Sequence, residues 1–245
     1  MPTRSLHDHD VHLWWAGLSI SDDERARLEA TLSADERVRA ARYRLGWLRR
    51  RFVVGRGILR VLLGEYLGID PAAVQLQYGP FGKPALASAH ASDVTFSLSH
   101  SKDVAVYAFS RGADVGVDIE HLRSRDGAAI VRRFFSVRER DIYCGLPDSQ
   151  KPLAFLLGWT RKEAYVKGRG VGLSECLADV EVTLAPGESA QLLTAPDPGG
   201  AARWWLEEIG AAGGCVGAVA VGARPRRLSM TTLTQEDLAR RCQWQ

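Results

Sequence analysis

One order of segments, a strand followed by two helices and then several strands, occurs twice along this chain. In each copy, a helix opens with a serine three residues before a glutamate, Ser33 with Glu36 and Ser136 with Glu139. This is the spacing of a capping box, in which the two side chains satisfy backbone donors at the start of a helix. The openings also share letters, LSADER and FSVRER. The pattern predicts an α+β fold built from two related halves.

The halves divide near Gly112 into 1–112 and 113–245, and we expect each to form a small antiparallel-rich sheet packed by helices. The expected long helices are 47–67 and 152–167; the expected strands are 11–18, 74–78, 94–99, 104–110, 113–120, 180–184, 203–209, 216–221 and 228–233; and the expected loops, rich in Gly and Pro, are 79–84 and 186–202.

Composition narrows the class of protein. The 245 residues are 46% apolar and 25% charged, which is typical of a soluble globular protein. No run approaches the ~20 apolar residues of a membrane helix, and the polar start MPTRSLHDHDVH is unlike a secretory signal. Because the cysteines are scattered without paired zinc spacing, we expect reduced thiols in the cytoplasm. These cysteines are Cys144, Cys176, Cys215 and Cys242.

Basic residues are concentrated in one region, with nine arginines between Arg37 and Arg60. The forked guanidinium group is well suited to phosphate. The region therefore predicts an anion site, a docking face for an acidic partner, or only a solvated basic helix face.

The segment VGVDIE alternates like a strand, with its three apolar residues on one face. Asp118 and Glu120 share the other face, with Cα atoms about 6.5 Å apart. Two carboxylates so placed repel each other unless a cation lies between them, and oxygen ligands suit Mg²⁺. The alternative is an edge strand whose polar face meets water.

A second group of candidate site residues, charged residues on a helix, lies in GWTRKEAYVKGRG. Glu163 and Lys167 fall inside the broad apolar arc of a helix, although an unpaired buried charge is costly. The arc is formed by Leu153, Leu156, Leu157, Trp159, Ala164 and Val166. Glu163 is thus a candidate third carboxylate for the cation, and Lys162 and Lys167 are candidates for phosphate charge. The alternative is an ordinary exposed pair between Glu163 and Lys167.

Two further segments carry candidate ligand contacts. In FSLSHSKD, Ser97 and Ser99 share one strand face, and His100 and Ser101 stand at the strand end, where ligand contacts are often made. Lys83 lies in the stiff turn of YGPFGKPAL, where it could meet phosphate as a point charge. His100 and Lys83 could equally be structural or exposed residues.

Two segments imitate ligand sites. HDHDVH near the start has metal-binding residue types, but a loose terminus is a poor cage. GRGVG, residues 168–172, has the composition of a phosphate loop. Phosphate loops precede a helix, whereas this segment follows one, so a helix C-cap explains it better.

Taken together, FGKPAL, FSLSHS, VGVDIE and WTRKEAYVKGRG, in this order between residues 81 and 170, resemble the Sfp-type phosphopantetheinyl transferases. That family activates nonribosomal peptide and polyketide synthases. The helix RRRFVVGRGILR adds a fainter similarity. The related holo-acyl-carrier-protein synthases are trimers of about half this length, with two residues between the acidic pair. Here Ile119 alone separates Asp118 from Glu120, which favours the Sfp type.

The resemblance implies a pseudo-dimeric monomer that binds coenzyme A in an active site between its halves. The cation-binding residues, for Mg²⁺ or Mn²⁺ on the pyrophosphate, would be Asp118, Glu120 and Glu163. The coenzyme-binding residues would be Arg51 and His100 at the 3′-phosphate, Lys83 and Pro84 at the nucleotide end, Ser99, and Lys162 and Lys167 at the phosphates. The catalytic residues would be Glu163 and Lys167. Arg49 and Arg50 stand beside Arg51, so the sequence leaves open which of the three arginines meets the 3′-phosphate.

The implied reaction moves 4′-phosphopantetheine from coenzyme A to a serine hydroxyl of apo acyl, peptidyl or polyketide carrier proteins and releases 3′,5′-ADP. Charge on the phosphate oxygens would be stabilised by Mg²⁺ and lysine. A base must take the serine proton, and Glu163 and a metal-held water are both open. No nucleic acid or membrane partner is expected.

Two other functions also fit parts of the pattern. A metal-dependent nuclease or phosphodiesterase uses similar residue types, but it commonly carries its acidic-x-Lys pair on a strand, whereas Glu163 and Lys167 lie four apart on a helix. A non-enzymatic module could use the arginines to dock an acidic partner, and would then not need Asp118.

Overall fold

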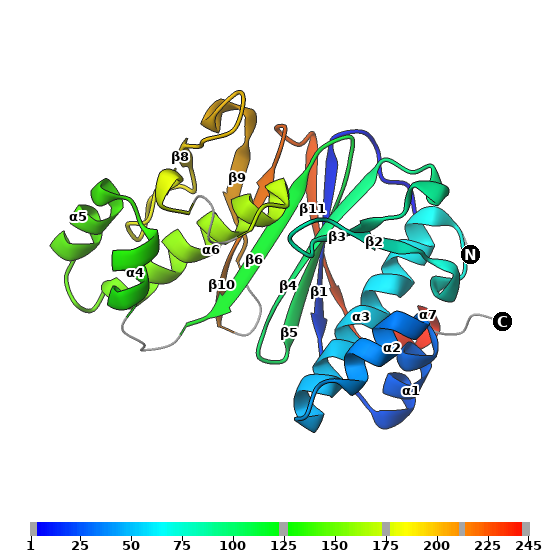
Figure 1. The fold of residues 1–245 in the computed structure, drawn as a ribbon. Coiled ribbons are helices and arrows are strands. Elements are labelled where there is room, and N and C mark those ends of the chain that lie inside the picture. Colours follow the sequence, from blue (N-terminus) through cyan, green and yellow to red (C-terminus); the bar gives the residue numbers. More distant parts are fainter. Residues whose placement is uncertain (1–3, 123–126, 173–176, 211–213, 242–245) are drawn as a thin grey trace.

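Two sheets stacked between two long helices form the body of the molecule (Figure 1). The structure is a computed structural model and describes residues 4–122, 127–172, 177–210 and 214–241. Helix α3 (Gly46–Leu67) covers the outer face of the first sheet, and α6 (Lys151–Arg169) covers the outer face of the second. The mixed α+β class predicted from the sequence is confirmed.

The first sheet has the order β11–β1–β5–β4, with β1 at Asp10–Gly17, β4 at Val94–Ser101, β5 at Val104–Arg111 and β11 at Arg227–Leu233. β1 pairs antiparallel with β5 and parallel with β11, and β4 pairs antiparallel with β5. A strand from the end of the chain thus completes a sheet made otherwise from its first half. The division at residue 112 and the pseudo-dimeric arrangement remain predictions.

The second sheet has the order β6–β10–β9 and is antiparallel throughout. Its strands are β6 (Val115–His121), β9 (Trp205–Glu208) and β10 (Cys215–Val221). Two small hairpins lie outside the sheets, β2 (Leu76–Tyr78) with β3 (Pro84–Leu86) and β7 (Glu181–Val182) with β8 (Leu192–Thr194).

Short helices surround the long ones: α1 (Asp22–Ala30), α2 (Ala34–Ala41) and α7 (Gln235–Arg241) near α3, and α4 (Ala128–Phe134) and α5 (Val137–Gly145) near α6 (Figure 1). Single 3₁₀ turns occupy Pro71–Ala73, Ser88–His90, Leu177–Asp179 and Ala201–Arg203. None of the helices described here has both the length and the apolar character that crossing a membrane requires.

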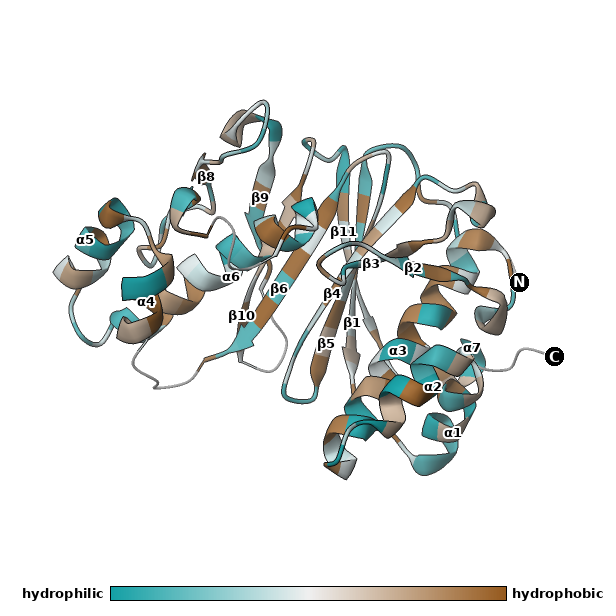
Figure 2. Ribbon diagram, viewed as in Figure 1, coloured by the Kyte–Doolittle hydropathy of each residue, from teal (hydrophilic) through white to brown (hydrophobic). Residues whose placement is uncertain are grey.

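The interior follows this layering. One buried cluster joins the facing sides of the two sheets and includes Val117 and Ile119 of β6 with Val106 of β5. A second cluster lies between α3 and the first sheet, and a third lies between α6 and the second. In Figure 2 the strands carry much of the hydrophobic colour, whereas α1 is mostly hydrophilic. Because only Leu28 of α1 is buried, that helix lacks the apolar periodicity needed to predict it.

Both predicted capping boxes are present, and each glutamate has a second role. Glu36 accepts the Ser33 N–H at 3.0 Å and is buried against Arg60 of α3, with 2.5 Å between Oε2 and Nε. Glu139 accepts the Ser136 N–H at 2.8 Å and is buried against Lys162 of α6, with 2.6 Å between Oε2 and Nζ. A buried carboxylate requires such a partner because desolvating an unpaired charge is costly.

Several predicted boundaries were wrong. The strand expected at 74–78 begins at Leu76, because the 3₁₀ turn that precedes it ends at Ala73. Of 180–184, only Glu181–Val182 pairs with another strand. The loop expected at 79–84 ends where β3 begins, at Pro84, whereas the loop expected at 186–202 contains the paired strand β8. These short strands depend on a partner rather than on their own periodicity.

Gly116 allows α6 to lie directly on β6. A Cβ atom at this position would be 2.0 Å from the Ala164 carbonyl oxygen and 2.2 Å from the Gly168 nitrogen. Both are helix backbone atoms, so no side chain could move aside to make room. The close contact places residues 163 and 167 of α6 over the acidic end of β6.

We predict that Gly116→Ala lowers the free energy of unfolding by at least about 2 kcal/mol, because the added methyl group forces α6 away from β6. Urea unfolding checks this. Gly17→Ala is the matched control, since a Cβ there meets no atom within 4 Å. Equal stability of the two variants would contradict the proposed contact.

Candidate active site

Side-chain hydroxyls join the edges of the two sheets. β4 and β6 lie side by side (Figure 1), and serines on β4 accept backbone N–H groups of β6. The three hydrogen bonds are Val117 N–H to Ser97 at 3.2 Å, Ile119 N–H to Ser99 at 3.3 Å and His121 N–H to Ser101 at 3.1 Å. We call Ser97, Ser99 and Ser101 the seam serines. Alternate positions of FSLSHS thus face β6, as the strand period predicted for Ser97 and Ser99.

The acidic pair of β6 lies along this seam. Asp118 Oδ1 accepts hydrogen bonds from Ser99 Oγ at 2.7 Å and from Lys167 Nζ at 2.6 Å. The Glu120 Oε2 atom accepts one from Ser101 Oγ at 2.9 Å. Asp118 is only 5% exposed, so the alternative of a polar strand face in water does not hold for it.

Glu163 is the third carboxylate in this region. Burial raises the pKa of Glu163 to about 7, and the negative charge of Asp118 adds to the increase, while Lys167 opposes it. Lys167 forms its salt bridge with Asp118, so the ordinary helix pair between Glu163 and Lys167 is not what the structure contains. Near neutral pH, Glu163 is therefore poised between its protonated and ionised forms.

These residues fit a hard cation. Asp118 Oδ2 is buried and has no hydrogen-bond partner among the described residues, although such an atom normally has one. The donors are all carboxylate oxygens, which Mg²⁺ and Mn²⁺ accept. Within the described ranges, however, no three His, Cys, Asp or Glu side chains already form a metal cage. A cation would have to draw Asp118, Glu120 and Glu163 closer together.

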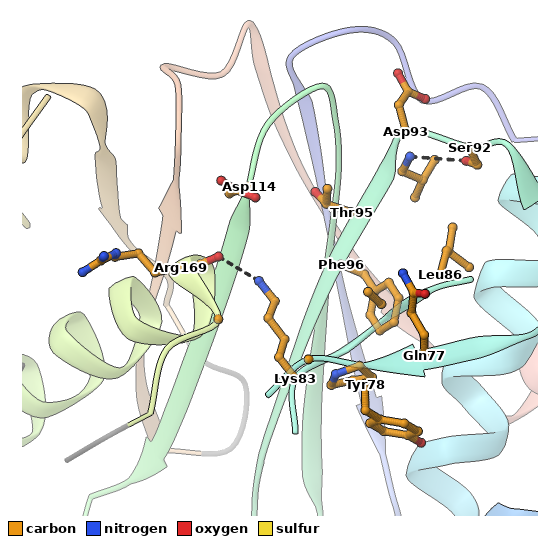
Figure 3. Close-up of a pocket in the computed structure, with 16 residues that line it drawn as sticks. Gln77, Tyr78, Lys83, Leu86, Ser92, Asp93, Thr95, Phe96, Asp114 and Arg169 are labelled. Atoms are coloured by element: carbon orange, nitrogen blue, oxygen red, sulfur yellow. Dashed lines mark hydrogen bonds between the residues drawn. The ribbon is translucent and has the colours of Figure 1, made fainter. Parts of the chain in front are cut away.

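Lys83 fixes the turn beside this site. Its Nζ donates to the carbonyl oxygen of Gly168 at 2.8 Å, drawn as a dashed line in Figure 3, and to that of Val115 at 3.3 Å. It thereby ties the turn to the end of α6. Burial lowers the pKa of Lys83. Lys83 and Pro84 line a cavity of about 280 Å³ together with Glu163 and Lys167. Lys83 and Pro84 also line the cavity of about 480 Å³ shown in Figure 3.

A cavity of about 360 Å³ at the C-terminal end of β4 gathers basic residues. Arg51, His100 and Lys102 line it, together with Arg56 and the acidic Glu120. The Arg51 Nε atom donates to Asp103 at 2.9 Å, and its guanidinium lies 4.7 Å from the Trp47 ring centroid.

The neighbours of Arg51 point elsewhere. Arg49 forms a salt bridge with Glu29, and Arg50 forms one with Asp22 of α1. Of the three adjacent arginines, Arg51 is the one that shares a cavity with His100.

Lys162 does not lie with the other candidates, which corrects its predicted role at the phosphates. It is fully buried, and its Nζ lies 2.6 Å from Glu139 Oε2. It also donates to the carbonyl oxygens of Val180 at 2.5 Å, Leu177 at 2.8 Å and Phe134 at 3.3 Å. With its donors occupied, Lys162 binds the short helices and β7 to α6 and has no capacity left for a phosphate.

The segments HDHDVH and GRGVG, which imitate ligand sites in the sequence, have different structures. Gly170 has φ 71° and donates its N–H to Val166 O, so GRGVG contains the C-cap of α6, as expected. In HDHDVH, strand β1 begins at Asp10, and His12 Nδ1 lies 2.8 Å from the Tyr66 hydroxyl.

The cysteines that the structure describes, Cys144 and Cys215, are both free. Cys176 and Cys242 lie outside the described residues.

Sequence reasoning missed Arg56 and Lys102, and it placed Ser101 at the strand end without recognising its contact with β6. The alternating serines of FSLSHS were a signal for Ser101, because a strand places all three hydroxyls on one face. Arg56 and Lys102 gave no such signal, since their shared cavity depends on how α3 crosses the turn after β4.

We predict that Glu163→Gln stabilises the metal-free protein at pH 8 by roughly 3 kcal/mol. A carboxyl whose pKa is raised on folding loses stability as pH rises from about 4.5 to about 7, and glutamine avoids this loss. The difference from the parent protein should therefore fade near pH 4.5. Thermal unfolding in EDTA measures it, with the exposed Glu207→Gln as the control. A variant less stable at every pH would contradict the pKa assignment.

Two sequence families match the chain in succession. Residues 19–111 match the family described as 4′-phosphopantetheinyl transferase, N-terminal, and residues 114–218 match the 4′-phosphopantetheinyl transferase superfamily. The two matches meet at the boundary between β5 and β6.

Curated relatives agree with these families. The chain is 42% identical to 4′-phosphopantetheinyl transferase HetI of Nostoc sp. over 90% of its length and 91% of that protein. It is 31% identical to a 4′-phosphopantetheinyl transferase of Bacillus subtilis, over 67% of this chain and 72% of the relative. The psf-1 transferase of Bacillus pumilus is also 31% identical, over 70% and 74%. The chain therefore belongs to the 4′-phosphopantetheinyl transferase superfamily and is an enzyme of that kind.

Proposed function

We propose that this enzyme transfers the 4′-phosphopantetheine group of coenzyme A to a serine hydroxyl of apo acyl, peptidyl or polyketide carrier proteins, with Mg²⁺ and release of 3′,5′-ADP. The observation that carries the proposal is the buried Asp118 Oδ2, which has no hydrogen-bond partner among the described residues and lies beside Glu120, Glu163 and Lys167. We also propose that the enzyme acts as a monomer in the cytoplasm, without a nucleic acid or membrane partner.

Coenzyme A carries a pyrophosphate and a separate 3′-phosphate, so its site needs cationic groups at two places. The cavity with Arg51, His100 and Lys102 offers one such place, and the cavity with Lys83 and Lys167 offers the other. The acidic residues lie between them, because Glu120 lines the first cavity and Glu163 the second. This order matches a molecule whose pyrophosphate must reach the carboxylates.

Asp118, Glu120 and Glu163 would hold the cation. When bound there, Mg²⁺ would supply positive charge to the pyrophosphate oxygens. Lys167 would not need to leave Asp118, since an ammonium group has three donors and can bind Asp118 and a phosphate oxygen together. Ser99 contributes less directly, because its hydroxyl already serves Ile119 N–H and Asp118.

In the transfer step, the serine oxygen of the carrier attacks the β-phosphorus, and the bond to the departing 3′,5′-ADP oxygen breaks. The serine proton must pass to a base. Glu163 is our candidate, because a carboxyl with a pKa of about 7 is partly ionised at neutral pH and is still basic enough to accept a proton. Lys167 would stabilise the charge on the phosphate oxygens.

Mass spectrometry of an apo carrier protein incubated with coenzyme A, Mg²⁺ and this enzyme tests the proposal. We expect the carrier to gain the mass of one phosphopantetheine, and we expect EDTA or Asp118→Ala to abolish the gain. Absence of the gain across fatty-acid, polyketide and peptide carriers, with folded enzyme, would contradict the proposal and favour a metal-dependent nuclease.

We further predict that Arg51→Ala raises KM for coenzyme A by about tenfold, because it removes a charge-assisted contact to the 3′-phosphate. KM for 3′-dephospho-coenzyme A should stay nearly unchanged. Arg50→Ala is the matched control, since Arg50 is the adjacent arginine and faces α1. Equal losses with both substrates would place Arg51 outside the 3′-phosphate contact.

A further inference from the structure

The three seam serines make the same backbone contact but differ in their second contact. Each hydroxyl accepts one N–H of β6. The β6 residue that precedes the bridged N–H is Gly116 for Ser97, Asp118 for Ser99 and Glu120 for Ser101. Among the described residues, Ser99 and Ser101 therefore donate to a carboxylate, and Ser97 does not. The chain thus contains its own comparison between a serine that only joins the sheets and serines that also hold an acid.

A serine hydroxyl has one donor and can accept two hydrogen bonds. Ser101 uses both functions, because it accepts His121 N–H at 3.1 Å and donates to Glu120 Oε2 at 2.9 Å. Its side chain is buried, with 5% of its surface exposed. The N–H contact fixes where the oxygen lies, so the proton can be directed only toward Glu120.

The two acids of β6 are held unequally. Asp118 accepts hydrogen bonds from two side chains, Ser99 and Lys167. Among the described residues, Ser101 is the one side chain that hydrogen-bonds the Glu120 carboxylate. Glu120 also lies near the end of β6 and is partly exposed. A glutamate in such a place loses substantial rotamer freedom when it is ordered, so its orientation depends strongly on this contact.

We propose that Ser101 is a positioning residue that holds the Glu120 carboxylate in the orientation needed to bind the catalytic cation. This inference rests on the proposed function. Groups that hydrogen-bond a metal-binding carboxylate orient it before the ion arrives, and their loss typically weakens metal affinity 10- to 100-fold. Ser101 hydrogen-bonds Glu120 in this way, whereas Ser97 hydrogen-bonds no carboxylate in the described part of the chain.

The test measures Mn²⁺ binding rather than turnover. Mn²⁺ is titrated into the full chain saturated with coenzyme A, and free Mn²⁺ is followed by electron paramagnetic resonance, with coenzyme A alone as the blank. We expect Ser101→Ala to weaken Mn²⁺ binding about tenfold or more. Ser97→Ala should keep the parent affinity, and Ser101→Thr, which retains a hydroxyl, should recover most of the loss.

Thermal unfolding of the same variants separates positioning from stability. Ser97→Ala and Ser101→Ala each remove one contact between the sheets, so both should lower Tm by similar amounts. The proposal is overturned if Ser101→Ala binds Mn²⁺ like the parent, or if Ser97→Ala weakens binding equally. A parent enzyme that holds no Mn²⁺ beyond the blank would instead overturn the metal site of the proposed function, and this proposal with it.

Discussion

The contact between β4 and β6 is the constraint on which the rest of the structure depends. An edge strand leaves N–H groups that must find partners when they are buried. On the edge of β6 that faces β4, the partners are the hydroxyls of the seam serines, whereas the other edge pairs with β10. The same hydroxyls reach Asp118 and Glu120. The hydrogen bonds that join the two sheets therefore also position the two acids.

The second constraint on the site is the balance of charge between its carboxylates and Lys167. Close packing of α6 on Gly116 brings Glu163 and Lys167 over the acids of β6, in a place with little water. Lys167 then lies beside three carboxylates. Burial, with the charge of Asp118, raises the pKa of Glu163, and Asp118 Oδ2 has no hydrogen-bond partner within the described ranges. Such an arrangement is costly for stability alone. It makes sense as a site completed by a cation and by phosphate groups from the substrate.

Local patterns predicted much of this from the sequence. Capping boxes depend on residues three apart, and the shared face of Asp118 and Glu120 depends on a strand period of two, so both could be predicted without a partner segment. The role of Lys162 could not. Both sides of α6 are buried, one against the second sheet and one against the short helices, and periodicity does not tell which neighbour a side chain will meet. The pairing of β11 with β1 and the choice of Arg51 over its neighbours likewise depend on contacts between distant segments.

The most direct measurement of the central claim is a crystal structure with coenzyme A and Mn²⁺, in which anomalous scattering locates the metal. We expect one strong anomalous peak within about 2.5 Å of carboxylate oxygens of Asp118 and Glu120, next to the pyrophosphate. The 3′-phosphate should lie at Arg51 and His100. A metal bound away from Asp118, or coenzyme A bound in a cavity away from β4 and β6, would contradict the central claim.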